Sequence, residues 1–346
     1  MLQPPISRRI LNLGDLMTQT ARRLPERTAF VWGDESWTWA EQNARTDAFA
    51  HALNAAGIEK GDRVLVQARN SNQMFETMFA CFKAGAVCVP VNFRLAPPEL
   101  AYIAGHSGAC AIVHDDIFAD HAAAALEKMP ECRLNVVIGE AAGDQQDYED
   151  LAAAHHGKMF HSARVEYDDA CWFFFTSGTT GHPKAAVLTH GQMGFVVTNH
   201  LADLLPGTTH EDASLVVAPL SHGAGIHQLT QVARGARTVL LAGERLDPDE
   251  AFRLIAEHRV SNMFTVPTIL KRLAESDAVD THDHSSLRHV IYAGAPMYRS
   301  DQQMILKRLG KCIVQYFGLG EVTGNITVLP AYEHDADDAV QTLSLI

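Results

Sequence analysis

The sequence lacks the features that mark membrane-spanning, secreted and nucleic-acid-binding proteins. Its longest apolar runs, such as residues 171–175 and 214–220, fall far short of the roughly 20 residues that a transmembrane helix needs. The amino-terminal residues contain no apolar segment before a small-residue cleavage site, so we expect no secretory signal. Basic residues are in the minority, since 28 Lys and Arg against 41 Asp and Glu leave a formal net charge of −13. This acidic balance argues against nucleic acid or an anionic membrane surface as the main partner.

Cysteine is sparse and shows no metal-binding or redox spacing. The six cysteines never form C-x-x-C and most have apolar neighbours, which predicts buried free thiols in a reducing cytosol. The 18 histidines include no H-E-x-x-H spacing. The His-Asp-His tract at 282–284 lies in a polar stretch and predicts a solvated loop rather than a metal site. We therefore expect a cytoplasmic protein.

Helical and strand-like patterns alternate along almost the whole chain, whose 346 residues suggest about two domains. Asp247, Pro248 and Glu250 predict a capped helix start. Strands separated by helices predict an α/β fold with mostly parallel sheets covered on both faces. The polar residues 140–169 are the best candidate for a linker between two such layers. Strands are expected at 63–67, 86–91, 109–113, 261–266, 289–293 and 313–317, and helices at 38–56, 72–84, 95–105, 268–275 and 300–309.

The most informative segment is a glycine- and hydroxyl-rich stretch that follows an apolar strand. Residues 172–175 (WFFF) predict a buried strand, and residues 176–181 (TSGTTG), Pro183 and Lys184 come directly after it. Hydroxyl groups, glycine N–H groups and a lysine charge in so short a stretch favour an anion such as a phosphate. A turn without a ligand is the bland alternative, and the number of specific positions argues against it. The spacing of the glycines and the lysine differs from that of a Walker A loop.

Residues 176–185 resemble the T-S-G-T-T-G-x-P-K-G signature of the adenylate-forming superfamily, which contains acyl-CoA synthetases, aryl-CoA ligases, nonribosomal peptide adenylation domains and luciferases. Ala185 replaces the last glycine of the signature, which matters only if the backbone there needs a positive φ. The resemblance covers residues 11–330. It implies an αβαβα sandwich of two mostly parallel sheets layered with helices. The implied parts are a first α/β subdomain (1–170), a second with the phosphate loop and the adenine and acyl sites (171–330), and a truncated tail (331–346).

Earlier and middle segments are similar to other motifs of the same superfamily. Residues 57–71 and 83–92 look like its G-x-x-x-G-D-x-V…N-S and K-A-G-A-x-x-x-P-x-N patterns, for which we predict structural roles only. Residues 219–225 (PLSHGAG) are similar to P-L-x-H-x-x-G, which implies that His222 lies between the nucleotide and the acyl pocket. A strand-end histidine satisfied by backbone groups is the alternative. A Ser221–His222 hydrolase is disfavoured, because the serine lacks a G-x-S-x-G elbow.

Two later segments complete the implied nucleotide site. Residues 292–297 (YAGAPM) look like the segment whose backbone lies along adenine, and residues 315–321 (QYFGLGE) look like Q-x-Y-G-x-T-E. In the second segment a glycine replaces the usual threonine, which removes one phosphate contact. The resemblance implies catalytic roles for Lys184, His222 and Glu321, with Glu321 as the Mg²⁺ ligand. It implies nucleotide contacts for Thr176, Ser177, Gly178, Thr179, Thr180, Gly181, Lys184, Gly294, Ala295, Pro296, Gln315, Tyr316, Phe317, Gly318 and Gly320.

The resemblance implies an ATP- and Mg²⁺-dependent acid–thiol ligase. A carboxylate attacks the α-phosphate of ATP to give acyl-AMP and pyrophosphate, and a thiol, usually coenzyme A, then displaces AMP. The implied partners are a small carboxylic acid, ATP and coenzyme A, with a homodimer left open. The candidate pocket wall is apolar and has no Lys or Arg, which favours a fatty or aromatic acid over an amino acid or dicarboxylate. Its residues are Phe195, His222, Gly225, Met263, Thr265 and Pro267.

The later motifs of the superfamily are missing from this sequence. We find no T-G-D aspartate, no G-R-x-x-D hinge and no lysine after Lys311. This predicts a chain truncated before the β-barrel and the C-terminal lid domain, with impaired activity on its own. Two alternatives stay open, namely a non-catalytic module that binds nucleotide or acyl ligands, and a core that needs a separate lid chain. The acidic residues 333–338 predict a solvated tail.

Overall fold

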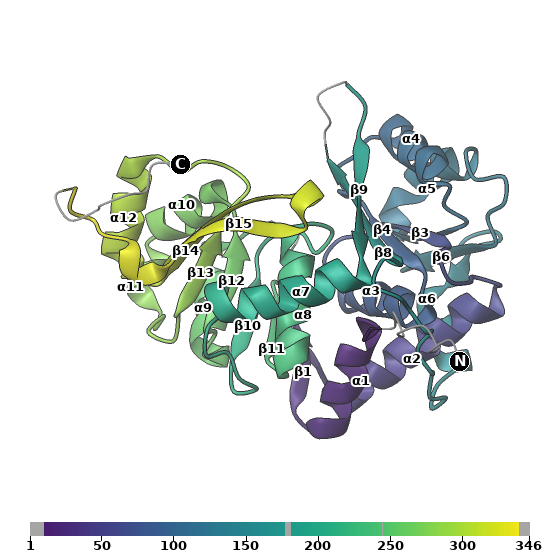
Figure 1. Ribbon diagram of the computed structural model, residues 1–346, viewed down its shortest axis with the longest axis horizontal. Helices are drawn as coiled ribbons and strands as arrows, with labels where there is room; N and C mark the ends of the chain where they lie inside the picture. Colours follow the sequence, from purple (N-terminus) through teal and green to yellow (C-terminus); the bar gives the residue numbers. More distant parts are fainter. Residues whose placement is uncertain (1–9, 177–180, 244, 339–346) are drawn as a thin grey trace, which may run out of the picture. The chain divides into compact units, whose positions relative to one another are not determined.

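The computed structural model describes residues 10–176, 181–243 and 245–338 and contains two sheets (Figure 1). By its internal contacts the chain forms two compact units. Unit 1 comprises Met1–Gln19, Asn43–Ala68 and Gln73–Phe195, and unit 2 comprises Thr20–Gln42, Arg69–Asn72 and Val196–Ile346. Four helices contribute residues to both units, namely α1 (Gly14–Arg23), α2 (Trp39–Ala55), α3 (Asn72–Ala84) and α7 (His190–Asn199).

Unit 1 contains a seven-stranded sheet with the order β7-β6-β5-β3-β4-β8-β9, parallel throughout except for the antiparallel pair β8–β9. In β3, Val64, Leu65 and Val66 are all buried, as expected for a parallel strand covered on both faces. The strands are β3 (Arg63–Gln67), β4 (Val87–Pro90), β5 (Ala111–Asp115), β6 (Leu134–Ile138), β7 (Gln146–Asp147), β8 (Ala170–Thr176) and β9 (Lys184–Thr189), and the helices are α3 (Asn72–Ala84), α4 (Pro97–Ser107), α5 (Ala119–Leu126) and α6 (Tyr148–Ala154).

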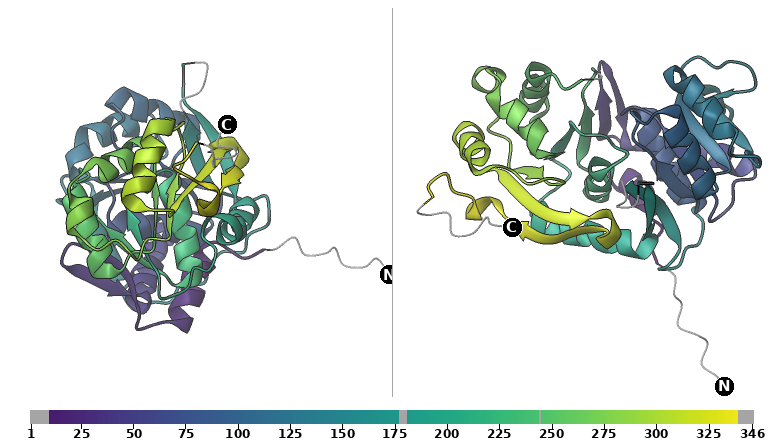
Figure 2. Two further views of the ribbon diagram at one scale, coloured as in Figure 1. Left: turned by 90° about the vertical axis from the view of Figure 1, so that its left-hand side faces the viewer. Right: turned by 90° about the horizontal axis from the view of Figure 1, so that it is seen from above.

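Unit 2 contains an eight-stranded sheet with the order β15-β14-β13-β12-β10-β11-β1-β2. The six central strands are parallel, and antiparallel strands close both edges, with β15 extending beside β14 as a long hairpin (Figure 2). The strands are β1 (Thr28–Trp32), β2 (Glu35–Thr38), β10 (Ala213–Val216), β11 (Arg237–Leu240), β12 (Asn262–Thr265), β13 (His289–Tyr292), β14 (Ile313–Leu319) and β15 (Gly324–Leu329), and the helices are α8 (Gly223–Arg234), α9 (Pro248–His258), α10 (Pro267–Glu275), α11 (Ala278–Thr281) and α12 (Arg299–Leu309).

The two faces of the unit 2 sheet are covered by different helices. Met263 and its same-face neighbours pack with residues of α9, α10 and α12 in one apolar core. Phe264 and its neighbours Ile291, Val314 and Tyr316 face the other side and pack with Leu204 and Leu205. Because successive strand side chains point to opposite faces, the one-residue step from Met263 to Phe264 separates two environments.

The predicted α/β fold of two mostly parallel sheets with helices is confirmed, and the described residues form open sheets without a barrel. The linker prediction for residues 140–169 is wrong, because this segment contains β7 and α6 and lies in unit 1. Its Tyr148 is buried and donates a 2.9 Å hydrogen bond to Glu76. A linker between two domains would not have such a buried side chain. The sheets also place β8 and β9 with unit 1, and β1 and β2 with unit 2, so the chain does not divide at one point.

The predicted solvated tail at residues 333–338 is only partly correct, because Glu333, Asp337 and Asp338 are exposed whereas His334 and Asp335 are not. His334 is completely buried, and its Nε2 lies 3.1 Å from the hydroxyl of Tyr292. Asp335 pairs with Lys311 at 2.8 Å and Asp338 pairs with Arg299 at 2.8 Å. The sequence pattern showed only the acidic charge, whereas the cations that pair with these carboxylates lie on or next to helix α12. Residues 339–346 lie outside the described residues.

All six cysteines are free, and all but the half-buried Cys132 are buried, as predicted. Burial raises the pKa of the Cys171 thiol and raises the pKa of the Cys312 thiol to about 12. Both sulfurs therefore stay protonated and unreactive at neutral pH. None of the described helices is long and apolar enough to cross a membrane.

Candidate functional site

Some of the predicted site residues of unit 2 lie in connections at one edge of its sheet. These connections follow the carboxyl ends of β10, β12, β13 and β14, which are neighbours in the sheet. Between β10 and β12 the connections change direction, because β10 leads through α8 to β11 on one side, whereas β11 leads through α9 to β12 on the other. In open parallel sheets, ligands bind outside the carboxyl ends of the strands at such a reversal. These connections carry His222, Gly294–Pro296 and Gly320–Glu321, and Pro267 begins α10 after β12.

His222 is the residue immediately before helix α8 and lies at this reversal. Its Nδ1 is 2.9 Å from the hydroxyl of the buried Ser221. Burial lowers the pKa of the imidazole, so His222 is neutral at neutral pH. A neutral imidazole next to a helix start can donate or accept one hydrogen bond without bringing a charge into the loop.

Asn70 fixes the loop that carries His222, a role that the sequence patterns did not reveal. Its Nδ2 donates to the carbonyl of Ala218 at 3.0 Å, and its Oδ1 accepts from the backbone N–H of Leu220 at 2.8 Å. One amide side chain, 150 residues from Leu220 in the sequence, therefore bridges both sides of Pro219. The N-S motif containing Asn70 was the only signal, and it does not show which loop the asparagine reaches.

A stack of rings lies beneath the first turn of α8. A Cβ atom at Gly223 would lie 2.7 Å from the Phe264 ring, so only glycine allows the helix to approach this closely. The ring of His227 stacks on Phe264 with centroids 4.6 Å apart, and on His200 at 4.5 Å. Tyr316 lies 5.9 Å from His227 and 6.4 Å from His200. None of the four ring nitrogens of the two histidines has a hydrogen-bond partner within the described part of the chain.

The predicted adenine segment is an exposed loop, and its glycine has a backbone conformation that favours glycine. Gly294 has φ +83°, and Gly294, Ala295 and Pro296 are all exposed after the buried strand β13. Gln315 differs from this picture, because its Oε1 accepts a 3.4 Å hydrogen bond from Tyr292. Tyr292 lies in the core on the α12 side of the sheet. This hydrogen bond gives the side chain of Gln315 a partner within the protein.

Glu321 lies in a short 3₁₀ turn after β14, with its side chain exposed. Phe317 and Leu319 from the same strand are also exposed. Thr323 ends the turn with φ +68°, an uncommon conformation for a residue other than glycine. The turn thus presents one carboxylate at the carboxyl edge of the sheet.

Gly318 of the Q-x-Y-G-like segment is required by the β14–β15 hairpin itself. A Cβ atom there would lie 1.9 Å from the carbonyl oxygen of Gly324. We expect Gly318→Ala to lower the free energy of unfolding by about 1–3 kcal/mol, measured by urea denaturation, because the backbone must move to admit the methyl group. Gly194→Ala is the matched control, since a Cβ there meets no atom within 4 Å. An unchanged urea midpoint for Gly318→Ala would contradict the expected clash.

The described residues on either side of the phosphate-loop segment belong to two antiparallel strands of unit 1, β8 and β9. Thr176 of β8 is paired with Lys184 of β9, and the side chain of Lys184 is exposed. Gly181 has φ +88°. Ala185 pairs with Phe175 inside the hairpin and does not have a positive φ, so this departure from the signature costs no backbone strain. The predicted phosphate contacts Ser177, Gly178, Thr179 and Thr180 lie outside the described residues.

The predicted acyl-pocket residues do not come together on one surface. Met263 belongs to the core against α9, α10 and α12, and the hydroxyl of Thr265 donates to the carbonyl of Ile291 at 3.0 Å. Gly225 is buried in the first turn of α8. Phe195 on α7 is 68% exposed and is grouped with unit 1. On the α8 side of the sheet, the ring nearest to Gly223 is that of Phe264. The predicted pocket included its neighbours Met263 and Thr265 but not Phe264.

Comparisons with known proteins agree with this arrangement. The family described as AMP-binding enzyme matches residues 17–343. Feruloyl-CoA synthase from an Amycolatopsis species is 34% identical over 319 residues, which cover 92% of this chain and 61% of that protein. The inhibitor-bound N-terminal domain of FACL13 from Mycobacterium tuberculosis is similar in structure, with a TM-score of 0.80 and 27% identity over 94% of this chain and 80% of that one. The anthranilate CoA ligase AuaEII has the same fold, with a TM-score of 0.85 at 22% identity, over 92% of this chain and 62% of that one.

Proposed function

The chain belongs to the AMP-binding enzyme family, and from this premise we propose that it is the nucleotide-binding core of an ATP-dependent acid–thiol ligase. In the proposed reaction a carboxylate oxygen attacks the α-phosphorus of ATP, and pyrophosphate leaves. The sulfur of coenzyme A then attacks the acyl carbon, and AMP leaves with the electrons of the broken C–O bond. The chain spans 61% of the length of the feruloyl-CoA synthase that it matches. We therefore propose that this chain by itself carries out the two steps poorly.

The observation that carries the proposal is the β8–β9 hairpin. Pairing of Thr176 with Lys184 brings together residues at the two ends of the glycine- and hydroxyl-rich stretch, and the side chain of Lys184 is exposed. Both steps bring anions together, so catalysis depends on positioning and on stabilising negative charge. We propose that Thr176, Ser177, Thr179, Thr180 and Lys184 hold the β- and γ-phosphates. His222 would stay neutral and orient the acid, and the Gly294 loop would lie along adenine.

We propose Glu321 as the protein ligand of Mg²⁺. Among the described residues no group of three or more His, Cys, Asp or Glu side chains could enclose a metal ion. A single exposed carboxylate fits Mg²⁺, which commonly takes one or two carboxylates together with substrate phosphates. When bound, the ion would neutralise phosphate oxygens. Gly320 offers no hydroxyl to a phosphate, which we expect to weaken nucleotide binding.

We propose a fatty or aromatic acid as the substrate. The α8 side of the sheet presents the rings of Phe264 and Tyr316 beneath Gly223, and no lysine or arginine belongs to this ring stack. The relatives named above include enzymes for ferulate and for anthranilate. Coenzyme A is the proposed thiol. The free state of all six cysteines supports a reducing cytoplasm as the location.

Replacing Lys184 with alanine is expected to weaken ATP binding by about tenfold or more, because a charge-assisted contact to phosphate is lost. Isothermal titration with ATP and Mg²⁺ measures the change. Lys307→Ala, which removes an exposed lysine on α12, is the control and should leave the affinity as it is. If Lys184→Ala binds ATP as tightly as the parent, the assignment of Lys184 to the phosphate site is wrong.

A module that binds nucleotide without chemistry is the second candidate. Release of pyrophosphate from ATP in the presence of carboxylic acids separates the two candidates. The ligase proposal expects slow, acid-dependent release, with acyl-AMP detectable by mass spectrometry. If ATP binds but fatty, benzoic and cinnamic acids release no pyrophosphate above background, the result favours the nucleotide-binding module over the ligase. Rapid thioester formation by the chain alone would contradict the proposed impairment.

A further inference from the structure

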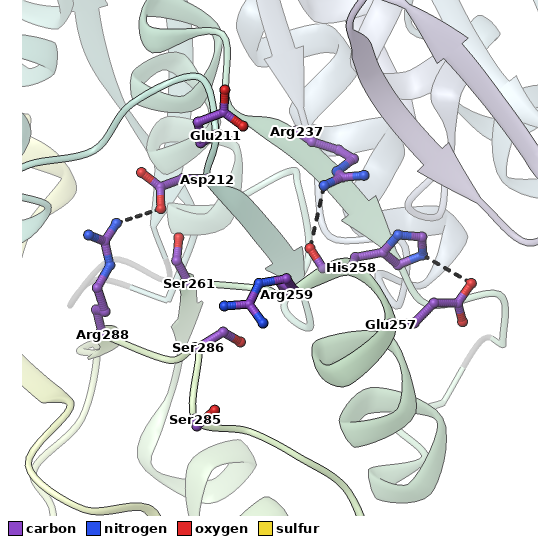
Figure 3. A pocket seen from close by; sticks show the side chains of 10 residues that line it. All are labelled: Glu211, Asp212, Arg237, Glu257, His258, Arg259, Ser261, Ser285, Ser286 and Arg288. Atoms are coloured by element: carbon purple, nitrogen blue, oxygen red, sulfur yellow. Dashed lines mark hydrogen bonds and ion pairs between the residues drawn. The ribbon is translucent and has the colours of Figure 1, made fainter.

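A cavity lies at the opposite edge of the unit 2 sheet from His222, Gly294 and Glu321 (Figure 3). Its volume is about 550 Å³, within the usual range for a small-molecule site. It is lined at the amino ends of the parallel strands by Asp212 before β10, Arg237 at the start of β11, Ser261 before β12 and Arg288 before β13. Every residue of the lining is charged, a histidine or a serine, so the cavity suits a hydrophilic ligand.

The carboxylates of this cavity already have cationic partners. Asp212 pairs with Arg288 at 2.5 Å, and Glu211 pairs with Arg27 at 2.7 Å. Glu257 pairs with Arg253 at 2.8 Å. These pairs neutralise the acidic part of the lining, so the remaining charge of the cavity comes from its other arginines.

Two guanidinium groups have no carboxylate of their own. Neither Arg237 nor Arg259 forms an ion pair within 4 Å in the described ranges, and the buried Nε of Arg237 has no hydrogen-bond partner there. Arg237 makes one long contact, of 3.4 Å, to the carbonyl of His258. Asp283 is near Arg259, but its carboxylate accepts a 2.9 Å hydrogen bond from the backbone N–H of Ser285. Two unpaired positive charges in one cavity are notable in a chain whose net charge is −13.

The backbone at Arg259 holds its side chain in the cavity. Arg259 ends helix α9 with φ +49° and ψ +49°, a left-handed conformation in which glycine is usual. Its guanidinium points toward Ser261 and Ser286 and away from Glu257 (Figure 3). A glycine at this position would end the helix with less strain, so placing the arginine side chain here has a cost in backbone strain.

We propose that this cavity binds a hydroxylated phosphate monoester, such as a sugar phosphate, with the dianionic phosphate between Arg237 and Arg259. Two guanidinium groups match the charge of the phosphate and offer paired N–H donors to its oxygens. The hydroxyl of Ser286 donates to the carbonyl of Val260 at 2.8 Å, so its oxygen is left to accept from a sugar hydroxyl. Glu257 and Glu211 can accept from further hydroxyls at the rim. This site is independent of the proposed ligase reaction.

Ribose 5-phosphate is the probe, and ribose is its uncharged counterpart. Titrations use the full chain carrying Lys184→Ala, so that phosphate binding at the proposed ATP site is weakened. We expect ribose 5-phosphate to bind at millimolar concentration or better and to raise the melting temperature, and ribose to do neither. Arg259→Gly is expected to weaken the binding by about tenfold or more, because one charged contact is lost. The same variant should melt at an equal or higher temperature without ligand, since glycine relieves the left-handed backbone.

Two further variants test whether the arginines of the cavity bind the phosphate. Arg237→Gln should weaken binding as Arg259→Gly does, whereas Arg272→Gln, an exposed arginine on α10, should have no effect. The proposal fails if ribose 5-phosphate does not bind, or if it binds the Arg259→Gly and Arg237→Gln variants as tightly as their parent. Failure of these tests leaves the ligase proposal untouched, because that proposal depends on Lys184 and pyrophosphate release.

Discussion

Replacing Lys83 with methionine is expected to destabilise the protein by about 3–5 kcal/mol, because it leaves a buried carboxylate without its cation. The side chain of Lys83 is completely buried, and its Nζ lies 2.5 Å from Oδ1 of Asp47 and 2.7 Å from Oδ1 of Asn43. The side chain of Asp47 is 4% exposed, so solvent has little access to its carboxylate once the ammonium is lost. Methionine keeps most of the apolar stem, so the change isolates the charge.

The double variant Lys83→Met/Asp47→Leu tests whether the pair or the packing is responsible. We expect it to recover part of the lost stability, because neither charge is then left alone in the core. Lys307→Met removes an exposed lysine and should stay within about 0.5 kcal/mol of the parent. Urea denaturation followed by circular dichroism measures all three. If Lys83→Met and Lys307→Met had equal midpoints, the buried pair would not be stabilising.

A steep loss of stability is expected as the pH falls from about 6.5 to about 4. Burial lowers the pKa of His190 and that of His200 from 6.5 to about 4, and it also lowers the pKa of His227. In the unfolded chain these imidazoles take up protons near pH 6.5, whereas the folded chain takes them up only near pH 4. The unfolded state therefore binds more protons in this range, and stability declines with falling pH by about 3 kcal/mol for each of His190 and His200.

The stack of His200 and His227 gives the cleanest measurement of this effect. The variant His200→Leu/His227→Leu should lose much of the pH dependence and gain stability at neutral pH, because unpartnered ring nitrogens are removed from the core. The variant is compared with the parent because Glu76 contributes a pH dependence of the opposite sign. Burial raises the pKa of Glu76 to about 7, so its contribution to stability increases as the pH falls. His161→Leu, at an exposed position, is the control. A double variant with the pH profile of the parent would show that the stack does not titrate as described.

Much of the local structure follows from the sequence, because it depends on neighbouring residues. The apolar spacing within 72–84 predicts α3, and Asp247 and Pro248 predict the start of α9, where the Asp247 side chain does accept from the N–H of Asp249. Glu250 departs from the predicted cap, since its carboxylate accepts from the distant Ala242 N–H at 2.7 Å. The glycine- and hydroxyl-rich loop was also recognisable, since its residue types lie next to one another.

The failures share one cause, which is that they depend on contacts between distant segments. The pattern at 261–266 predicts a strand but not which face each residue takes, and only the structure shows that Met263 packs with α9, α10 and α12 whereas Phe264 packs on the opposite face. Residues 140–169 look like a linker until Tyr148 meets Glu76, 72 positions away in the sequence. Asp335 looks solvated until Lys311 is placed beside it.

The sequence by itself determined the α/β class, the helices and strands, and the membership of the phosphate-loop motif in a known family, because periodicity and short motifs are local properties. Tertiary structure alone decided the strand order, whose reversal beside β10 places His222 at the carboxyl edge of the sheet. It also decided that Asn70 fixes that loop and that Arg237 and Arg259 share a cavity at the other edge. Strand order and side-chain convergence arise from burying apolar faces against one another, a requirement that no single segment of the chain expresses.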